Sequence, residues 1–227
     1  MSVVEHAVFL RRLKDANWPL EVFYDVGASI GRWSVEAQTV FPEARFERFE
    51  PLLGKHAPLD TSTRHELVRQ GGLHAVALSD IGGVAKIKVL GNLGVGSSIL
   101  VLDSDYRKDT TFVTCELARM DDFIAERNLP KPDFIKLDTQ AAELKVLRGA
   151  VETLKHSKLL LTETWMRRVY GPETPLFHEL ANFLYEQNYV LFEMLSLQEG
   201  RDADGTLRWF DAVFVNKTFA SFPSGML

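Results

Sequence analysis

The sequence has one cysteine, no long hydrophobic run and no excess of positive charge, and each absence excludes a class of protein. The lone Cys115 cannot form an intramolecular disulfide, so the 227 residues do not make a disulfide-stapled secreted scaffold. No apolar run approaches the roughly 20 residues that a membrane-spanning helix requires. The net charge of −5 disfavours nucleic acid as a partner, because nucleic-acid binders usually present a basic face. We therefore expect a cytoplasmic protein that binds neither membranes nor nucleic acid.

Two familiar binding motifs are also missing. The chain contains no G-x-G-x-x-G sequence, the phosphate-binding fingerprint of dinucleotide enzymes. Its six histidines include no pair at the i, i+4 spacing of helical zinc ligands. Asp138 and Glu163 carry oxygen ligands that suit magnesium, but no third ligand is evident, so we predict no metal site. These absences weigh against a dinucleotide cofactor and against a metal centre.

What the sequence does contain is an alternation of short apolar runs and helical patterns. The apolar runs, rich in Val, Ile and Phe, predict strands at Val22–Val26, Arg45–Phe49, Leu73–Leu78, Phe134–Leu137, Leu159–Glu163, Tyr189–Met194 and Phe210–Val215. Apolar residues at spacings of three and four predict helices near residues 33–40, 144–154 and 177–184. Strands separated by helices imply βαβ crossovers, hence a Rossmann-like α/β fold with a mainly parallel central sheet.

Two stretches depart from this rhythm. Between residues 82 and 116, the alternating segments Ala85–Leu90 and Thr111–Glu116 flank a glycine- and serine-rich loop and predict an antiparallel β insertion. Near the end, Asp204-Gly205 predicts a hairpin turn and hence an antiparallel last strand. Because no linker-like segment is present, we expect one domain over 1–227, with a helical extension at 1–21 and a core at 22–217.

The first strand leads into a glycine turn in the segment FYDVGASIGRWS. Asp25 lies near the carboxyl end of the strand, and the small residues Gly27, Ala28, Ser29 and Gly31 then form a turn that leads into a helix. Ligands of open α/β sheets bind outside the carboxyl ends of the strands. Glycine lets the backbone turn sharply and approach a ligand, and the N-terminus of the next helix favours an anionic group. We therefore predict that a cofactor binds at this turn.

Two further strand ends carry polar residues. Glu50 follows the second strand, where its carboxylate can accept hydrogen bonds from two ribose hydroxyls. Ser79 and Asp80 follow the third strand and would form a polar edge for an adenine, although Asp80 equally suits the turn before Gly82. Because the turn has the spacing D-x-G-x-x-x-G, these residues favour S-adenosylmethionine (SAM) over a dinucleotide as the cofactor.

These segments resemble those of the FkbM-type methyltransferases, SAM-dependent enzymes associated mostly with O-methylation. The resemblance runs from about Tyr24 to Lys217 and is carried by DVGASIG, FEP, ALSD, SSI, MDDF, KLDTQAAELKVLRGA and FDAVFV. It implies a Rossmann-like methyltransferase fold and SAM as the cofactor. The residues that it implies for the cofactor are Asp25, Gly27, Ala28, Gly31, Glu50, Ser79 and Asp80, and for the region of the transferred methyl Asp138 and Glu143.

One residue departs from the family pattern. Family members usually have glycine where this chain has Ala141, in the segment DTQAAE. If the backbone there requires a positive φ, alanine costs roughly 1 kcal/mol or more relative to glycine. We expect any consequence to fall on the geometry of this loop.

The carboxylates after the fourth and fifth strands are the candidate catalytic groups. A hydroxyl acceptor needs a base, and Asp138 at the end of the fourth strand is the leading base or substrate-orienting carboxylate. Glu143 and Glu163 are supporting candidates, but Glu143 equally suits the first turn of a helix and Glu163 a structural hydrogen bond. Lys136 lies on the same strand face as Asp138 and could pair with a carboxylate.

The methyl acceptor is less defined than the cofactor. The resemblance favours a hydroxyl on a sugar or a secondary metabolite, hence a small-molecule or saccharide partner, and homodimerisation is left open. Tyr170, Trp165 and Trp209 suit either an aromatic acceptor wall or core packing, and His178 suits a helix surface. Two alternatives stay open: an NAD(P)-dependent oxidoreductase, which shares the glycine turn and the ribose acid, and a SAM-binding module without turnover.

Overall fold

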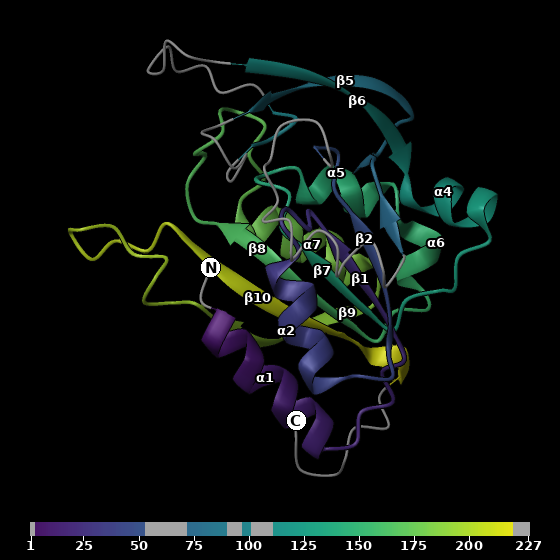
Figure 1. Cartoon of the computed structure of the whole chain (residues 1–227). Coiled ribbons are helices and arrows are strands. Elements are labelled where there is room, and N and C mark those ends of the chain that lie inside the picture. The colour runs from purple at the N-terminus through teal and green to yellow at the C-terminus, as the bar shows by residue number, and fades with distance from the viewer. Residues whose placement is uncertain (1–2, 53–71, 90–96, 101–110, 220–227) are drawn as a thin grey trace.

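The computed structural model describes residues 3–52, 72–89, 97–100 and 111–219, and its centre is a seven-stranded sheet in the order β3-β2-β1-β7-β8-β10-β9. The strands are β1 Val22–Val26, β2 Arg45–Phe49, β3 Leu73–His74, β7 Phe134–Leu137, β8 Leu159–Trp165, β9 Tyr189–Leu195 and β10 Trp209–Asn216. The pairs among β3, β2, β1, β7 and β8 are parallel, whereas β10 runs antiparallel to both of its neighbours. The predicted Rossmann-like fold with an antiparallel last strand is confirmed (Figure 1).

Helices cover both faces of this sheet. They are α1 Val3–Asp15, α2 Arg32–Val40, α4 Met120–Arg127, α5 Glu143–Arg148, α6 Val151–Leu154 and α7 Phe177–Glu186, with a short 3₁₀ turn at Lys217–Phe219. On one face α1 and α2 lie side by side over a core that includes Phe23 and Phe134 (Figure 1). On the other face the remaining α-helices cover a core that includes Tyr24 and Ile135. Because neighbouring residues of a strand point to opposite faces, the continuous apolar runs fill both cores.

A second, three-stranded sheet is drawn at the top of Figure 1. It contains β4 Ala77–Ser79, β5 Gly83–Val89 and β6 Thr111–Arg119 in the order β4-β6-β5, and β5 is antiparallel to β6. This confirms the predicted β insertion at about residues 82–116. Residues 91–96 of its predicted glycine-rich loop lie outside the described residues.

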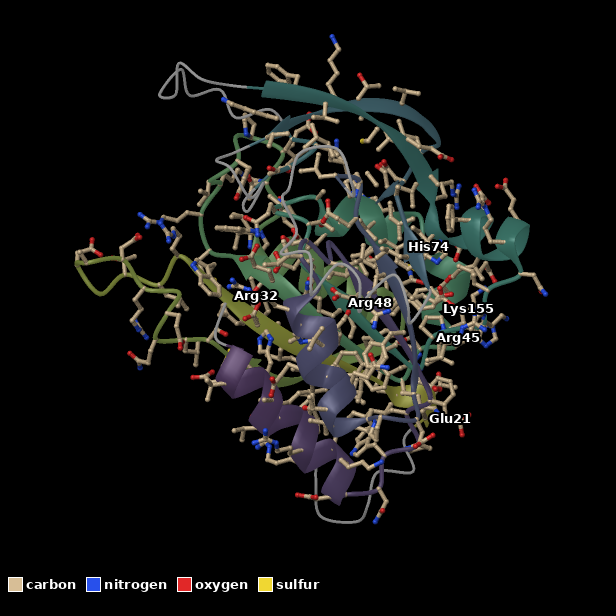
Figure 2. All side chains as sticks on the ribbon, viewed as in Figure 1. Glu21, Arg32, Arg45, Arg48, His74 and Lys155 are labelled. Atoms are coloured by element: carbon tan, nitrogen blue, oxygen red, sulfur yellow. The ribbon has the colours of Figure 1, made fainter. Side chains whose placement is uncertain are left out.

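The prediction of one strand over Leu73–Leu78 is wrong, because the chain changes sheets within this apolar run. Its first two residues form β3 beside β2, and Ala77–Ser79 form β4 beside β6. His74, labelled in Figure 2, anchors β3. Its Nε2 lies 2.7 Å from Oε2 of Glu47, and its ring stacks on Phe49. The run contains no proline or glycine that would predict a break. The change of sheet follows from the strands that β3 and β4 pair with.

The helix predicted over residues 144–154 is also divided, into α5 and α6. Gly149, between them, lies against β4: a β-carbon on it would meet the carbonyl oxygen of Ser79 at 2.0 Å. The carboxylate of Asp121 accepts hydrogen bonds from two backbone N–H groups in the first turn of α6, at 3.0 and 2.8 Å. This close approach and this cap start a new helix where the apolar stripe alone predicts a continuous one.

A buried polar contact joins the N-terminal helix to the last strand. Nε2 of His6 on α1 lies 3.0 Å from Oδ2 of Asp211 on β10. The hydroxyl of Ser196 donates to the same carboxylate oxygen at 2.6 Å, and all three side chains are buried. The extension predicted at residues 1–21 therefore packs onto the core.

Candidate functional site

A cleft lies at the carboxyl ends of β1, β2 and β7, where open α/β sheets bind their ligands. Counted together with its open mouth, it holds about 700 Å³ of unfilled space. Its walls come from the glycine turn after β1, residues 50–52, residues 76–78, residues 97–99 and the loop that follows β7. Part of the β insertion therefore forms one wall of the cleft.

The turn after β1 requires glycine at its first position. Gly27 has a φ of 76°, and a β-carbon there would lie 1.9 Å from the carbonyl oxygen of Asp138 at the end of β7. The N–H groups of Gly27 and Ala28 both donate to the carbonyl oxygen of Phe49, at 2.9 and 3.1 Å. Gly31, with a φ of 77°, is the N-cap of α2. The turn thus joins three strand ends through backbone contacts and leaves this wall of the cleft free of bulky side chains.

Glu50 lies on the cleft wall beside this turn. Its Oε2 accepts a hydrogen bond from the N–H of Ser29, and its Oε1 accepts one from the N–H of Leu52, both at 2.8 Å. Burial raises the pKa of Glu50, and these two hydrogen bonds offset part of that rise. The carboxylate is therefore held in one orientation at the edge of the cleft.

Asp25 is buried behind the glycine turn, where it pairs with Lys136. It accepts hydrogen bonds from Oγ of Ser34 at 2.6 Å and from Nζ of Lys136 at 2.9 Å. The same Nζ donates to the carbonyl oxygen of Gly27 at 3.1 Å and lies 3.7 Å from Oδ2 of Asp138. Burial alone would lower the pKa of Lys136, but the two carboxylates raise it above its ordinary value. The predicted pairing of Lys136 with a carboxylate is confirmed.

Gln140 connects the carboxylate that follows β7 with a carboxylate on β8. Its Nε2 donates to Oδ1 of Asp138 at 2.7 Å and to Oε2 of Glu163 at 3.1 Å, and its Oε1 accepts a hydrogen bond from the hydroxyl of Tyr170. Asp138 and Gln140 line the cleft. Burial, and then the carboxylates of Asp138 and Glu143, raise the pKa of Glu163 well above its ordinary value.

Glu143, in the first turn of α5, holds the loop that follows β7. Its Oε1 accepts hydrogen bonds from the N–H of Thr139 at 2.8 Å, from the N–H of Ala141 at 3.2 Å and from the hydroxyl of Thr139 at 3.1 Å. Its Oε2 is buried without a hydrogen-bond partner among the described residues. Burial raises the pKa of Glu143 to about 7. These contacts support the loop, and the part of Glu143 as a supporting catalytic candidate stays a prediction.

Two consecutive residues of this loop have a left-handed backbone. Gln140 has a φ of 54° and Ala141 a φ of 75°. Ala141 stands where the FkbM-type pattern has glycine, so the positive φ anticipated at this position is confirmed, and alanine adopts it under strain. Its methyl group is buried in a cluster with Leu100, Trp165 and Tyr170.

The aromatic candidates belong to the same cluster. The rings of Trp165 and Tyr170 meet edge to face with 5.3 Å between their centroids, and Trp209 packs against the cluster. Trp165 is 5% exposed and Tyr170 is 8% exposed, so in this structure they are packing residues rather than an open wall. His178 is exposed on α7, as predicted.

Ser79 and Asp80 lie outside the described lining of the cleft. Ser79 ends β4 and Asp80 follows it, and Oγ of Ser79 donates to Oδ1 of Asp80 at 3.1 Å. Ala77 and Leu78, the two preceding residues of β4, line the cleft instead and present an apolar surface. The role of Ser79 and Asp80 beside an adenine stays a prediction.

The sequence places Ser29 in the turn but does not predict its contact with Glu50, and it gives no prediction for Gln140 as a residue of the site. Ser29, with a φ of 49°, donates its backbone N–H to Glu50, and a pattern of side chains does not predict such a backbone contact. Gln140 is a polar residue just after a strand end, which is a usable signal, but its second partner is 23 residues further along the chain.

The described part of the chain offers no metal centre. Within the ranges that the structure covers, no three His, Cys, Asp or Glu side chains are grouped to hold a metal ion. The thiol of Cys115 is buried on β6. The same ranges contain no helix with the length and apolar character that a bilayer crossing needs.

Comparison with known proteins places the chain among methyltransferases. Residues 25–191 match the family model described as the methyltransferase FkbM domain. The chain is 31% identical over 166 residues to the AMB antimetabolite synthetase AmbE of Pseudomonas aeruginosa, a match that covers 58% of this chain and 8% of that protein. It is 27% identical over 172 residues to the 31-O-demethyl-FK506 methyltransferase FkbM of Streptomyces tacrolimicus, covering 64% of this chain and 63% of that protein.

A solved structure supports the fold. The crystal structure of methyltransferase FkbM from Methylobacillus flagellatus matches with a TM-score of 0.51 at 18% sequence identity, over 86% of this chain and 43% of that chain. The chain therefore spans less than two thirds of the length of each of these three proteins.

The site fits the cofactor of this family. The backbone cradle at Gly27, which a β-carbon would fill, and the fixed carboxylate of Glu50 lie on one cleft with the loop that follows β7. The matched residues 25–191 include all three features and most of the chain. The chain belongs to the FkbM family of methyltransferases, whose cofactor is S-adenosylmethionine.

Proposed function

We propose that the protein methylates a hydroxyl group of a small acceptor, a sugar or a secondary metabolite. The observation that carries this proposal is the position of Asp138, whose carboxylate lines the cleft beside the glycine turn. A hydroxyl acceptor needs such a base, because its proton must leave as the new bond forms. The relative named 31-O-demethyl-FK506 methyltransferase supports an oxygen acceptor. The net charge of −5 favours a small acceptor over nucleic acid.

Three parts of the cleft would hold the cofactor. The open backbone around Gly27 leaves room for its methionine part, and the N-terminus of α2 favours the carboxylate of that part. Glu50 would accept hydrogen bonds from the ribose hydroxyls. The apolar side chains of Leu78 and Ile87 line the cleft where they would cover the adenine.

The protein's own part in the chemistry is alignment and the handling of one proton. When bound, SAM supplies an electrophilic methyl group on a sulfonium sulfur. Asp138 takes the proton of the acceptor hydroxyl, and Lys136 and Gln140 hold its carboxylate in place from either oxygen. Alignment supplies roughly 7–11 kcal/mol of barrier reduction. A positioned base adds roughly 10²–10⁴-fold in rate.

Calorimetric titration separates this proposal from the oxidoreductase alternative. We expect SAM and S-adenosylhomocysteine to bind and NADH to give no heat of binding, because the turn lacks the dinucleotide spacing. Binding of NADH without binding of SAM would refute the proposal.

Product formation tests the reaction itself. The protein is incubated with SAM and a panel of saccharide and polyketide hydroxyl acceptors, and S-adenosylhomocysteine is measured. On an acceptor that is methylated, Asp138→Asn should lower the rate by roughly 10²–10⁴-fold. The control Glu173→Gln, which changes an exposed carboxylate, should keep the native rate. SAM binding without product on any acceptor would favour the SAM-binding module, and full turnover by Asp138→Asn would remove the base assignment.

A further inference from the structure

The amide of Gln140 uses all of its hydrogen-bonding groups within the site. Its two N–H groups point to Oδ1 of Asp138, at 2.7 Å, and to Oε2 of Glu163, at 3.1 Å. Its carbonyl oxygen accepts a hydrogen bond from the hydroxyl of Tyr170. The two carboxyls also fix which end of the amide faces them, because a flipped amide would set its carbonyl oxygen against their oxygens. Gln140 is therefore a specific bridge between two acids.

The surroundings of this bridge tolerate one negative charge better than two. Glu163 faces the carboxylates of Asp138, of Glu143 and of Asp211, which lies opposite it on β10. The nearby cation, Lys136, donates to Asp25 and lies 3.7 Å from Asp138. Lys136 therefore offsets the negative charge of Asp25 and Asp138 more than that of Glu163. Of the two carboxyls that Gln140 joins, Glu163 is the one that more readily keeps a proton.

The backbone of the loop is strained in a way that places this amide. Gln140 and Ala141 both have positive φ, although neither is glycine. Glu143 holds the loop in that shape through hydrogen bonds from the N–H groups of Thr139 and Ala141. Strain of this kind persists where the surrounding structure fixes it, and it concentrates at functional sites.

We propose that Gln140 is a positioning residue that joins Asp138 and Glu163 into one acid–base pair holding a single proton, with the proton on Glu163 and the charge on Asp138. The charged member is the one that lines the cleft. This inference rests on the proposed function, since it explains how Asp138 stays ready to accept a hydroxyl proton. Glu163 is then a neutral support for the pair rather than a second base.

The test is a titration of the full chain without cofactor or acceptor. The side-chain carboxyls are labelled with carbon-13, and the Glu163 signal is identified by its loss in Glu163→Gln. We expect its titration midpoint to lie well above that of an ordinary glutamate. Asp138→Asn removes the neighbouring charge and should lower this midpoint by about one pH unit or more. An unchanged midpoint in Asp138→Asn would overturn the pair.

The bridging role has its own variant and control. Gln140→Asn tolerates the positive φ but is one methylene too short to reach both carboxyls. Because the amide N–H groups stabilise the charged forms, its loss should raise the Glu163 midpoint by about one pH unit. Gln198→Asn, an equal shortening at an exposed site, should leave the midpoint unchanged. A lower melting temperature in Gln140→Asn with an unchanged midpoint would show a merely structural role and overturn the proposal.

These outcomes are separable from those of the proposed function. A pair that titrates as expected in a protein that methylates no acceptor would contradict the function and leave the pair standing. If the protein methylates an acceptor but the titration midpoint of Glu163 is the same in Asp138→Asn, the pair is contradicted and the function stands.

Discussion

The backbone of Gly27 rests on the backbone of Asp138, so closely that a β-carbon on Gly27 would lie 1.9 Å from the carbonyl oxygen of Asp138. The first residue of the cofactor turn and the proposed base are therefore in direct contact across two neighbouring strands. Adding a β-carbon to Gly27 would have to displace either the turn or Asp138. Cofactor binding and catalysis thus depend on the same few atoms.

Gly27→Ala is expected to lose about 3 kcal/mol or more of the free energy of unfolding, because the clash is with backbone and the φ of 76° adds strain. Urea denaturation measures this loss, and calorimetry should show much weaker SAM binding. The matched control is Gly205→Ala, whose φ is 82° but whose β-carbon would meet no described atom within 4 Å. That control should cost only about 1 kcal/mol. Equal costs at the two positions would contradict the proposed contact.

Lys136→Met should destabilise the protein by about 3–5 kcal/mol, since it leaves Asp25 as a buried carboxylate without its cation. Lys145→Met breaks an exposed pair with Glu173 and should cost less than about 1 kcal/mol. Both are measured by chemical denaturation at neutral pH. Adding Asp25→Asn to Lys136→Met should recover much of the loss, and no recovery would argue against the pairing as the cause.

Ala141→Gly should change the free energy of unfolding by less than about 1 kcal/mol, because relief of the positive φ offsets the lost burial of one methyl group. Ala37→Gly, at an equally buried position inside α2, should cost about 2 kcal/mol, since glycine is poor in a helix and loses the same methyl. Denaturation curves of the two variants give the comparison. A larger loss at Ala141 than at Ala37 would show that the left-handed backbone carries no strain.

Glu143 should make the protein less stable as the pH rises through neutrality. Its pKa is raised to about 7 in the folded chain from 4.5, so the folded state holds this proton more tightly than the unfolded state. The resulting stability is complete below the unfolded value and is lost as the pH rises to and beyond the folded value, about 3 kcal/mol in all.

Glu143→Gln tests this dependence, because glutamine can keep the acceptor for Thr139 and Ala141 without titrating. Relative to the variant, the native protein should lose about 3 kcal/mol between about pH 5 and about pH 8. The exposed change Glu173→Gln should leave the native pH profile unaltered. Parallel profiles for the native protein and Glu143→Gln would contradict the buried, protonated state of Glu143.

Much of the fold is predictable because local patterns and tertiary pairing agree. The strands β1, β2 and β7 have the bounds that their apolar runs predict, and the antiparallel β5 and β6 follow from alternation. The patterns fail where a distant partner decides the structure. Nothing in the run Leu73–Leu78 shows that its second half pairs with β6, and nothing in the stripe of residues 144–154 shows that Gly149 meets the backbone of β4.

The candidate site is predictable in place but less so in detail. A parallel sheet brings strand ends together, so Gly27, Glu50 and Asp138 meet at one cleft as predicted from their positions. Which way each side chain points depends on packing: Asp25 turns to a buried lysine. The bridge made by Gln140 needs a partner on β8, and one-dimensional patterns do not encode that distance.

The contact between His6 and Asp211 joins residues separated by 205 positions in the chain. A ribosome makes α1 well before β10, the strand on which α1 docks and which lies between β8 and β9 in the sheet. Contacts of such long sequence separation form late, because the intervening chain must first be ordered. Helix α1 therefore docks late, and during synthesis its apolar face stays uncovered until β10 has been made.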